Sequence, residues 1–420
     1  MSNVVIKPST LCGTVRVPPS KSDVHRAIIC ASLAKGVSTV SPVAFSEDIS
    51  ATIDCIKALG AEVFVDGDKV TINSTKIFEN KTADLQCRES GSTVRFFIPV
   101  AAAGGVNAVF NGKGRLPQRP LGVYTDLLPK HGVECITHGG LPFEIKGQLD
   151  SGRFDVPGDI SSQFITGLLF ALPLLDGDSV IHLTSPLQSK GYIDMTLSVQ
   201  KQFGVEIITD GNDYIIKGNQ KYVPCDYITE GDWSQAAFFL VGGALGGDIT
   251  VEGVKKDSFQ GDKEIAEILG RFGAEVEQSD YSIKCKAEKL RAIEIDAAQI
   301  PDLVPVLSVC AAFAEGTTRI YNAQRVRLKE SDRLAAISDC INSCGGKVTE
   351  TEDGLLIEGA KSIKGGFAEG YNDHRIVMSM AIAALRSESG IVVSDRESIN
   401  KSYNEFFDDY NHIGGQAEEC

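Results

Sequence analysis

Gly60-Ala61-Glu62-Val63 decides the fold of this chain, because the same short phrase returns five times further along. The other copies are Gly132-Val133-Glu134-Cys135, Gly204-Val205-Glu206-Ile207, Gly273-Ala274-Glu275-Val276, Gly345-Gly346-Lys347-Val348 and the divergent Gly414-Gly415-Gln416-Ala417. The leading glycines lie 72, 72, 69, 72 and 69 positions apart. A fixed period indicates a repeated supersecondary unit. The chain is therefore predicted to hold six copies of one unit.

Each leading glycine stands between a helical pattern and a hairpin pattern. Apolar residues recur at helical spacing from Ile49 to Leu59, and a glycine just past a helix end often takes a positive φ. After Gly60, the alternating stretches 63–65 and 70–72 flank the turn sequence Asp66-Gly67-Asp68, which favours a hairpin.

A second helix is predicted upstream of the first in every copy. Its starts are Ser20-Lys21-Ser22-Asp23, Glu89-Ser90-Gly91-Ser92, Ile160-Ser161-Ser162-Gln163, Gly231-Asp232-Trp233-Ser234, Ile300-Pro301-Asp302 and Tyr371-Asn372-Asp373-His374. Ser, Asp and Asn are preferred N-caps because their side-chain oxygen accepts from unpaired first-turn amides. The unit is therefore predicted as strand, helix, strand, helix and hairpin, which is a βαβαββ pattern.

The sixth copy is too short for its own hairpin, since five residues follow Gly415. The free strand pattern Asn3–Lys7 is predicted to complete it. A chain of this length exceeds the usual size of one core, so we expect two α/β domains of three units each. Domain A would hold residues 20–228, and domain B would hold residues 1–19 and 229–420. The crossovers near Pro18-Pro19 and residues 224–229 would form a double hinge.

The composition excludes several classes of protein. With 23% charged and 43% hydrophobic residues the chain is an ordinary globular one, and the net charge of −15 argues against a nucleic-acid partner. No apolar run reaches about 18 residues and no signal-peptide pattern is present, so we expect a cytoplasmic protein without membrane attachment. The eleven cysteines are scattered without a C-x-x-C pair, which is typical of reduced thiols and gives no metal motif.

Cations gather at the predicted helix starts despite the negative net charge. They are Lys21, Arg26, Arg95, Arg119, Lys329, Arg333, His374, Arg375 and Lys401. Helix N-termini attract anions, and Arg favours bidentate pairing with carboxylate or phosphate, so the pattern predicts a site for anions. Asp302 and Glu330 stand inside this cationic set, where a carboxylate is a natural general acid or base.

Simpler interpretations apply to each position taken singly. A Ser or Asp at a helix start is usually only a cap, and Arg271, Lys263 and Arg327 are expected to be solvated. Asp332 would pair with Arg333 or cap its helix, and Trp233 would be packing. The functional interpretation is favoured because the cations fall at the same phase of the repeat.

These residues resemble those of the 5-enolpyruvylshikimate-3-phosphate synthase family, and the resemblance spans nearly the whole chain. The matching motifs, in order, are Val17-Pro18-Pro19-Ser20-Lys21-Ser22 with Arg26, Gly91-Ser92 with Arg95, Arg119-Pro120, Ser161-Ser162-Gln163, Lys190-Gly191-Tyr192-Ile193-Asp194, Pro301-Asp302, Lys329-Glu330-Ser331-Asp332-Arg333, Asp373-His374-Arg375 and Lys401-Ser402-Tyr403. The resemblance implies an α/β fold of two domains, each of three repeated βαβαββ units in an inside-out α/β barrel, with six units in all.

The resemblance also implies the ligands and their residues, with no metal or organic cofactor. Shikimate 3-phosphate would be bound by Lys21, Ser22, Arg26, Ser161, Ser162, Gln163, Ser189, Tyr192, Asp302 and Lys329. Phosphoenolpyruvate would be bound by Lys21, Gly91, Arg119, Gln163, Arg333, Arg375 and Lys401. The catalytic residues would be Lys21, Asp302 and Glu330.

The implied reaction is a transfer of the enolpyruvyl group to the 5-hydroxyl of shikimate 3-phosphate, with release of phosphate. Asp302 would accept the hydroxyl proton, while Glu330 and Lys21 are candidates to protonate and deprotonate C3. The family's inhibitor glyphosate would occupy the phosphoenolpyruvate pocket, and Gly91 predicts sensitivity to it. We expect a monomer whose domains close on the first anion.

Two departures and two alternatives accompany the resemblance. Arg325 stands where an asparagine is usual, and Glu89-Ser90-Gly91-Ser92 replaces the commoner N-[AS]-G-T loop. One alternative is UDP-N-acetylglucosamine enolpyruvyl transferase, although that family has Lys-Asn at Lys21-Ser22 and a cysteine that residues 112–119 lack. The other is a non-catalytic anion-binding protein, against which the presence of Asp302 and Glu330 argues. The fourth unit carries no matched residue at its helix starts and is interpreted as a structural copy.

Overall fold

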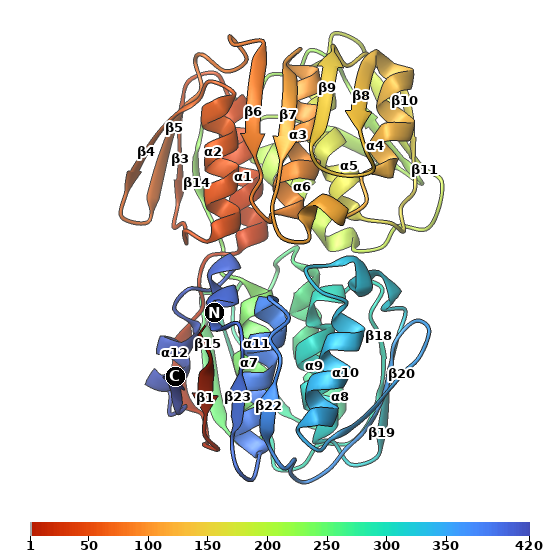
Figure 1. The fold of residues 1–420 in the computed structure, drawn as a ribbon. Coiled ribbons are helices and arrows are strands. Elements are labelled where there is room, and N and C mark those ends of the chain that lie inside the picture. Colours follow the sequence, from red (N-terminus) through yellow and green to blue (C-terminus); the bar gives the residue numbers. More distant parts are fainter. Residues whose placement is uncertain (1) are drawn as a thin grey trace. The chain divides into compact units, whose positions relative to one another are not determined.

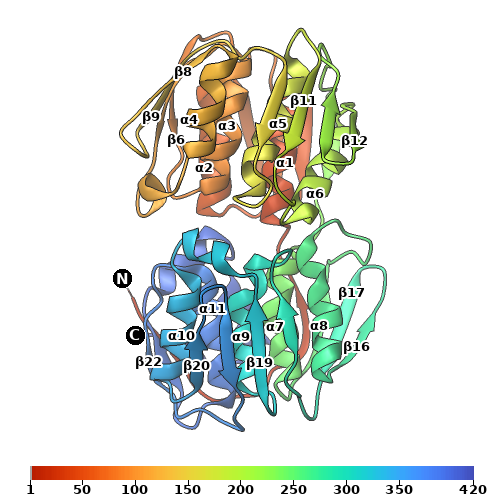
Figure 2. The ribbon, with the colours of Figure 1, turned by 90° about the vertical axis from the view of Figure 1, so that its right-hand side faces the viewer.

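The computed structural model describes residues 2–420 and divides the chain into two compact units. The central unit is Lys21–Thr229, and the terminal unit combines the segment up to Ser20 with Glu230–Cys420. Each unit contains three four-stranded sheets and its own hydrophobic core (Figures 1 and 2). The predicted α/β class with six repeated units is confirmed.

The second repeat shows the unit in full. Its elements are β6 (Thr82–Gln86), α3 (Gly91–Ala103), β7 (Asn107–Asn111), the 3₁₀ helix η1 (Leu116–Gln118), α4 (Gly122–Leu127), η2 (Leu128–His131), β8 (Val133–Thr137) and β9 (Phe143–Gly147). The sheet order is β6-β7-β9-β8, in which β6 and β7 are parallel and the other pairs are antiparallel. This is the predicted βαβαββ pattern, with the second helix broken into short turns.

The third and fifth repeats have the same order of elements and the same sheet topology. The third contains β10 (Arg153–Val156), α5 (Ser162–Ala171), η3 (Leu172–Leu174), β11 (Ser179–Leu183), α6 (Lys190–Gln202), β12 (Ile207–Asp210) and β13 (Asp213–Ile216). The fifth contains β18 (Glu294–Asp296), η5 (Pro301–Leu303), α9 (Val304–Ala312), β19 (Thr317–Tyr321), η6 (Gln324–Leu328), α10 (Arg333–Ser343), β20 (Lys347–Glu350) and β21 (Leu355–Glu358).

The other three repeats each take one strand from a distant part of the chain. The first contains α1 (Lys21–Leu33), β3 (Val37–Ser41), α2 (Glu47–Ala58), β4 (Glu62–Asp66) and β5 (Lys69–Asn73), with β14 (Asp226–Ile228) as its first strand. The fourth contains α7 (Trp233–Ala244), β15 (Asp248–Glu252), η4 (Gly261–Glu264), α8 (Ile265–Phe272), β16 (Glu275–Gln278) and β17 (Ser282–Lys286), with β2 (Cys12–Arg16) as its first strand.

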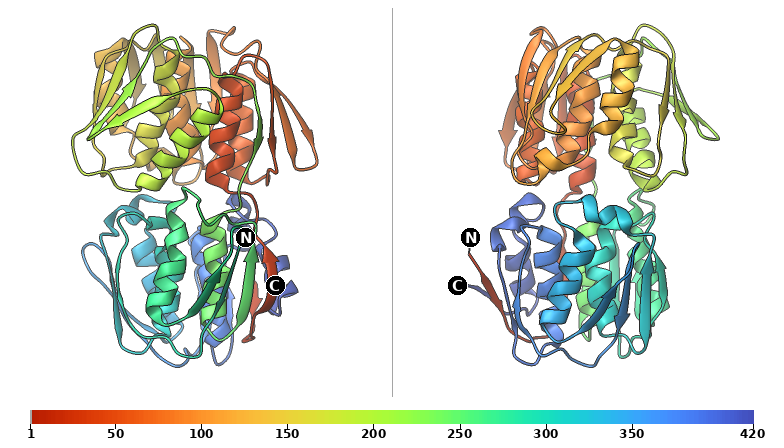
Figure 3. Two further views of the ribbon diagram at one scale, coloured as in Figure 1. Left: turned by 180° about the vertical axis from the view of Figure 1, so that it is seen from behind. Right: turned by 45° about the vertical axis from the view of Figure 1, so that its right-hand side comes forward.

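The sixth repeat takes its fourth strand from the start of the chain. It contains β22 (Gly366–Ala368), α11 (His374–Ala383), η7 (Ala384–Arg386), β23 (Ile391–Val393), η8 (Arg396–Lys401), α12 (Phe406–His412) and β24 (Ala417–Glu419). Strand β1 (Val4–Ile6) lies antiparallel between β23 and β24, so both ends of the chain share one sheet (Figure 3).

The two helices of a repeat differ in how they are buried. The first helices, α1, α3 and α5 in the central unit and α7, α9 and α11 in the terminal unit, are buried on nearly every side. A helix that is apolar all round belongs in a core. The second helices bury one face only; in α8 that face is Ile265, Ile268, Leu269 and Phe272. Sheets with one buried and one exposed face enclose the buried helices.

The local signals of the repeat are confirmed. All six leading glycines have positive φ: Gly60 +109°, Gly132 +82°, Gly204 +80°, Gly273 +104°, Gly345 +88° and Gly414 +105°. At four predicted helix starts the N-cap side chain accepts from the first turn, namely Ser90, Ser161, Asp232 and Asp373. Within residues 2–420, no helix is both long and apolar enough to cross a membrane.

Candidate functional site

Arg26 bonds two other residues predicted for shikimate 3-phosphate in the central unit, Ser22 and Tyr192, and also Thr196. Its Nη1 donates to the Ser22 carbonyl at 2.7 Å and its Nη2 to the Tyr192 carbonyl at 3.0 Å, while Nε donates to Thr196 Oγ1 at 2.8 Å. Burial lowers the pKa of Arg26 to about 10, so the guanidinium stays charged at neutral pH. These bonds tie the start of α1 to α6.

Gln163, at the start of α5, connects that helix to the start of α3. Its Oε1 accepts from Arg95 Nη1 at 2.7 Å and its Nε2 donates to Ser92 Oγ at 2.8 Å. Ser161 Oγ caps α5 by accepting from the Gln163 amide at 3.3 Å, and Ser162 is buried beside it. The simple cap interpretation of Ser161 is therefore correct, although capping leaves its hydroxyl proton available to a ligand.

Gly91 lies against the guanidinium of Arg119. A Cβ at Gly91 would lie 2.5 Å from Arg119 Nη1, closer than any side chain could tolerate without a shift. The φ of Gly91 is ordinary, so a side chain here would act by displacing the end of the Arg119 side chain rather than by straining the backbone. Arg119 itself is buried.

Ser189, another predicted site residue, lies just before α6 and has a left-handed conformation with φ of 57°.

Lys21 has a carboxylate partner that the sequence analysis missed. Its Nζ lies 2.9 Å from Asp48 Oδ2, and both side chains are mostly buried. Asp48 stands twelve positions before Gly60, just as Arg333 stands twelve before Gly345, and Arg119 stands thirteen before Gly132. The phase of the repeat was the signal that could have identified Asp48.

Asp302 is surrounded by cations in the terminal unit. Its Oδ1 lies 2.8 Å from Arg333 Nη1, 3.3 Å from Lys329 Nζ and 3.6 Å from Arg375 Nε. Arg375 Nη1 also donates to the Asp302 carbonyl at 3.0 Å. Four residues predicted from the sequence therefore meet at one carboxylate.

Arg333 is fully buried and bonds three carboxylates. Nη2 donates to Glu330 Oε2 at 2.6 Å, Nη1 donates to Asp302, and Nε donates to Asp373 Oδ2 at 2.8 Å. The three carboxylates raise the pKa of Arg333 against the effect of its burial. In return, Arg333 lowers the pKa of Asp373 against that residue's own burial. A ligand carboxylate at Arg333 would compete with these partners.

Lys401, at the end of η8, donates to the Asn372 carbonyl at 2.7 Å. Asn372 and its neighbour Tyr371 have φ of 50° and 53°, a left-handed pair that turns this carbonyl toward the lysine. The structure thus brings Lys401 to the start of α11 in the terminal unit, which also carries Arg375.

The fourth repeat places a buried acid near this cluster, which the interpretation as a structural copy did not anticipate. Asp262, in η4, accepts a hydrogen bond from Ser234 Oγ. Its other oxygen, Oδ1, has no hydrogen-bond partner in the structure. Burial, followed by repulsion from Asp302, raises the pKa of Asp262 to about 7. The fourth repeat therefore adds a buried carboxyl whose pKa depends in part on Asp302.

Several simpler interpretations are settled by the contacts. Asp332 caps α10 by accepting from the Ala335 amide, and its ionic partner is Arg327 at 3.0 Å rather than Arg333. Arg327 is therefore not merely solvated, because it also pairs with Glu350. Trp233 is fully buried as expected. Arg325, the departure from the family pattern, donates to the Ala298 carbonyl at 2.8 Å.

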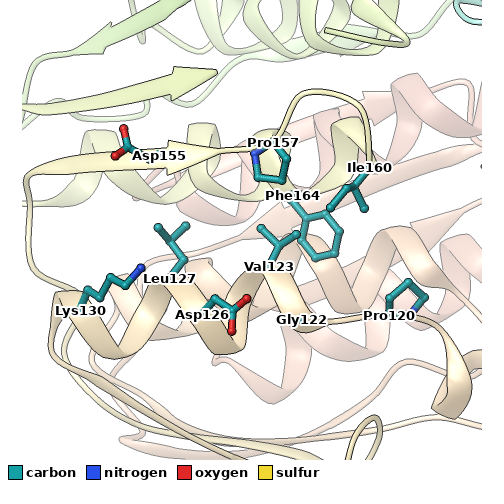
Figure 4. A pocket seen from close by; sticks show the side chains of 10 residues that line it. All are labelled: Pro120, Gly122, Val123, Asp126, Leu127, Lys130, Asp155, Pro157, Ile160 and Phe164. Atoms are coloured by element: carbon teal, nitrogen blue, oxygen red, sulfur yellow. The ribbon is translucent and has the colours of Figure 1, made fainter. Parts of the chain in front are cut away.

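A separate pocket of about 360 Å³ lies beside α4 in the central unit (Figure 4). Its lining is Pro120, Gly122, Val123, Asp126, Leu127, Lys130, Asp155, Pro157, Ile160 and Phe164. None of the predicted site residues lines it, although Pro120 and Phe164 adjoin Arg119 and Gln163 in sequence. Within residues 2–420, no group of three His, Cys, Asp or Glu side chains is placed to hold a metal ion.

Comparison with solved structures defines the class of fold. The enolpyruvyl transferase NikO from Streptomyces tendae superposes with a TM-score of 0.80 at 15% identity, covering 100% of this chain and 98% of that one. The EPSP synthase from Acinetobacter baumannii superposes with a TM-score of 0.85 at 28% identity over all of both chains.

The sequence comparisons establish the family. The chain belongs to the EPSP synthase (3-phosphoshikimate 1-carboxyvinyltransferase) family, whose model matches residues 5–410. The 3-phosphoshikimate 1-carboxyvinyltransferase of Clostridium acetobutylicum is 45% identical over 100% of this chain and 99% of that relative. The protein is accordingly a transferase, and the resemblance identified from the motifs is confirmed.

Proposed function

We propose that this protein transfers the enolpyruvyl group of phosphoenolpyruvate to the 5-hydroxyl of shikimate 3-phosphate. The hydroxyl oxygen adds to C2 of phosphoenolpyruvate while C3 gains a proton, giving a tetrahedral ketal. The ketal then loses a proton from C3 and breaks its C2–O bond to phosphate, which leaves an enol ether and inorganic phosphate. The family membership supports this activity.

The observation that carries the proposal is the convergence of Lys329, Arg333 and Arg375 on Asp302. Three cations keep this carboxylate ionised, and an ionised carboxylate can accept the proton of a substrate hydroxyl. Glu330, held by the same Arg333, is a candidate to exchange a proton with C3. A non-catalytic anion-binding protein would not need these two acids among its cations.

The central unit supplies the other predicted ligands. We propose that Lys21, Ser22, Arg26, Ser161, Ser162, Gln163, Ser189 and Tyr192 bind shikimate 3-phosphate, and that Lys21, Gly91, Arg119 and Gln163 bind phosphoenolpyruvate. Ordered donors stabilise developing charge better than mobile ones, and the bonds of Arg26 and Gln163 give that order. A methyl group at Gly91 would displace Arg119 and so alter the phosphoenolpyruvate pocket.

Phosphate release from phosphoenolpyruvate tests the proposal directly. We expect release with shikimate 3-phosphate and none with UDP-N-acetylglucosamine as the acceptor. Asp302→Asn should lower kcat by about 10²- to 10⁴-fold, because it removes a general base. The exposed Asp280→Asn in the same unit is the control and should leave kcat unchanged. Release with the UDP-sugar alone, or an unaltered Asp302→Asn enzyme, would overturn the assignment.

We further propose that the two compact units act as domains of a cytoplasmic monomer. Each unit has a separate core and three complete sheets, which is what an independent domain requires. Light scattering at several protein concentrations tests the oligomeric state; a mass of twice that of one chain would contradict the proposal.

A further inference from the structure

Four buried side chains connect three helices of the central unit. His25 Nδ1 lies 2.7 Å from Thr52 Oγ1, Thr52 Oγ1 lies 2.9 Å from Thr93 Oγ1, and Thr93 Oγ1 donates to Ser90 Oγ at 2.7 Å. The residues belong to α1, α2 and the start of α3, and each is at most 1% exposed. We call this set the hydroxyl relay.

The direction of the relay follows from its last bond. Thr93 gives its only hydroxyl proton to Ser90, so it must accept from Thr52, since a hydroxyl has one proton to donate. Thr52 therefore accepts from His25, whose proton must lie on Nδ1. The other ring nitrogen, Nε2, is buried without a hydrogen-bond partner. His25 is thus a neutral donor of defined tautomer.

The surroundings of His25 keep it neutral. Burial, and then the charges of Lys21 and Arg26, lower the pKa of His25 well below its ordinary value. From α2 the facing charge is Asp48, which pairs with Lys21, and from α3 the nearest ring is Phe96 with centroids 6.4 Å apart. A second proton on the ring would be a buried charge beside two cations. The relay therefore keeps one arrangement at neutral pH.

A second contact between α1 and α2, the Lys21–Asp48 ion pair, lies one helical turn from the His25–Thr52 bond. Lys21 and His25 are one turn apart on α1, and their partners Asp48 and Thr52 are one turn apart on α2. The Lys21–Asp48 pair sets Lys21 relative to α2, and the relay continues from α2 to the cap of α3. Ser90 Oγ accepts the Thr93 amide at this cap, immediately before Gly91.

The start of α3 lies directly against the Arg119 guanidinium, so the position of this helix affects where the guanidinium can lie. The Gly91 backbone lies so close to Arg119 that an added Cβ would be 2.5 Å from the guanidinium. A shift of α3 by a fraction of an ångström would therefore change the Gly91–Arg119 contact. Ser92, the next residue, also accepts from Gln163 and would move with it.

We propose that His25 and the hydroxyl relay are positioning elements that set the start of α3 relative to Lys21, and so determine affinity for phosphoenolpyruvate. The proposal rests on the proposed function. His25 is buried and is assigned to neither substrate; it acts through Thr52, Thr93 and Ser90. Shikimate 3-phosphate shares Lys21 and Gln163 with phosphoenolpyruvate. Its other assigned contacts in the central unit, Arg26, Ser161, Ser162, Ser189 and Tyr192, lie outside the relay, so its affinity should depend on the relay less.

Steady-state kinetics of Thr52→Val test the proposal. This nearly isosteric change removes both bonds of Thr52, and the KM for phosphoenolpyruvate should rise about tenfold, as expected for misplaced binding groups. The KM for shikimate 3-phosphate should change less than about twofold. Thr52→Ser keeps the hydroxyl and should restore most of the affinity. Ser32→Ala, which removes a buried α1 hydroxyl bonded only within its own helix, is the matched control and should have no effect.

Equal rises of both KM values, or a Thr52→Ser enzyme as impaired as Thr52→Val, would overturn the proposal. Nitrogen NMR of the wild-type imidazole gives a second test that needs no activity: His25 should be the neutral Nδ1–H tautomer between pH 6 and 8, and an Nε2–H tautomer would contradict the relay. If the wild-type protein transfers no enolpyruvyl group, the proposed function fails while the NMR result still decides the relay.

Discussion

At the residue scale, the chemistry depends on carboxylates kept in different states by their neighbours. Asp302 has Lys329, Arg333 and Arg375 within 4 Å, and opposite charges at such distances favour the ionised form of a carboxyl group. Asp262 is buried and accepts a hydrogen bond from the Ser234 hydroxyl, while burial and the nearby Asp302 raise its pKa to about 7. Two aspartates of the terminal unit, Asp262 and Asp302, thus have environments that favour different protonation states.

The raised pKa of Asp262 makes stability depend on pH. Its pKa rises from 3.8 when unfolded to about 7 when folded, because of burial, Asp302 and Asp232, opposed by Arg375 and Ser234. When folding raises the pKa of a carboxyl group, the folded state binds its proton more tightly than the unfolded state. The resulting stability is complete at a pH below the unfolded-state pKa and is lost as the pH rises through the folded-state pKa. The Asp262→Asn variant should not lose this stability as the pH rises, because asparagine does not ionise.

Urea unfolding of the wild-type protein and Asp262→Asn at pH 5, 6, 7 and 8 measures the effect. The free energy of unfolding of the wild type, relative to the variant, should fall as pH rises over this range. A difference that stays constant with pH would show that Asp262 keeps the same charge throughout.

At the element scale, each repeat ends its second helix with a glycine for a stereochemical reason. Gly273 follows α8 with φ of +104°, and a Cβ there would lie 3.3 Å from the Lys289 carbonyl. Gly270, one turn earlier in the same helix, has an ordinary φ, is exposed, and has open space around its Cα. A substitution at Gly270 therefore tests helix propensity, whereas a substitution at Gly273 tests the requirement for a positive φ.

Gly270→Ala and Gly273→Ala should have opposite effects on the free energy of unfolding. Alanine at Gly270 should stabilise by about 1 kcal/mol, because glycine is the poorer helix former. Alanine at Gly273 should destabilise by about 1–2 kcal/mol, because an L residue is strained in the left-handed region. Chemical denaturation of both variants checks this; a stabilising Gly273→Ala would contradict the role assigned to the repeated glycine.

At the scale of the whole molecule, three of the six sheets depend on strands distant in sequence. Strand β14 completes the first repeat, β2 the fourth and β1 the sixth. In β1, Ile6 is fully buried in the core of the terminal unit, whereas the adjacent Val5 is only half-buried. The sixth repeat therefore depends on a strand of three residues, Val4–Ile6, at the other end of the sequence.

Ile6→Ala should destabilise the terminal unit by about 2–5 kcal/mol, because it leaves a cavity between paired strands. The single tryptophan, Trp233, is buried in the same unit, so its fluorescence reports that unit's unfolding. Val5→Ala is the control and should shift the fluorescence midpoint less. Equal shifts for the two variants would show that β1 is not packed as described.

The sequence by itself determined the repeat, its helix starts and its helix-ending glycines, because capping and positive φ are local requirements recorded within a few residues. The cations at those starts, and the acids Asp302 and Glu330, were predictable for the same reason. Only the tertiary structure decided the partners: Asp48 for Lys21, Asp373 for Arg333 and Asp262 near Asp302. The residues of the first two pairs are 27 and 40 positions apart in sequence and lie on different helices, so their charges meet only when those helices pack together. Helix caps and turns follow from residues within one repeat, whereas the interactions between charges depend on distances that are set only by the tertiary fold.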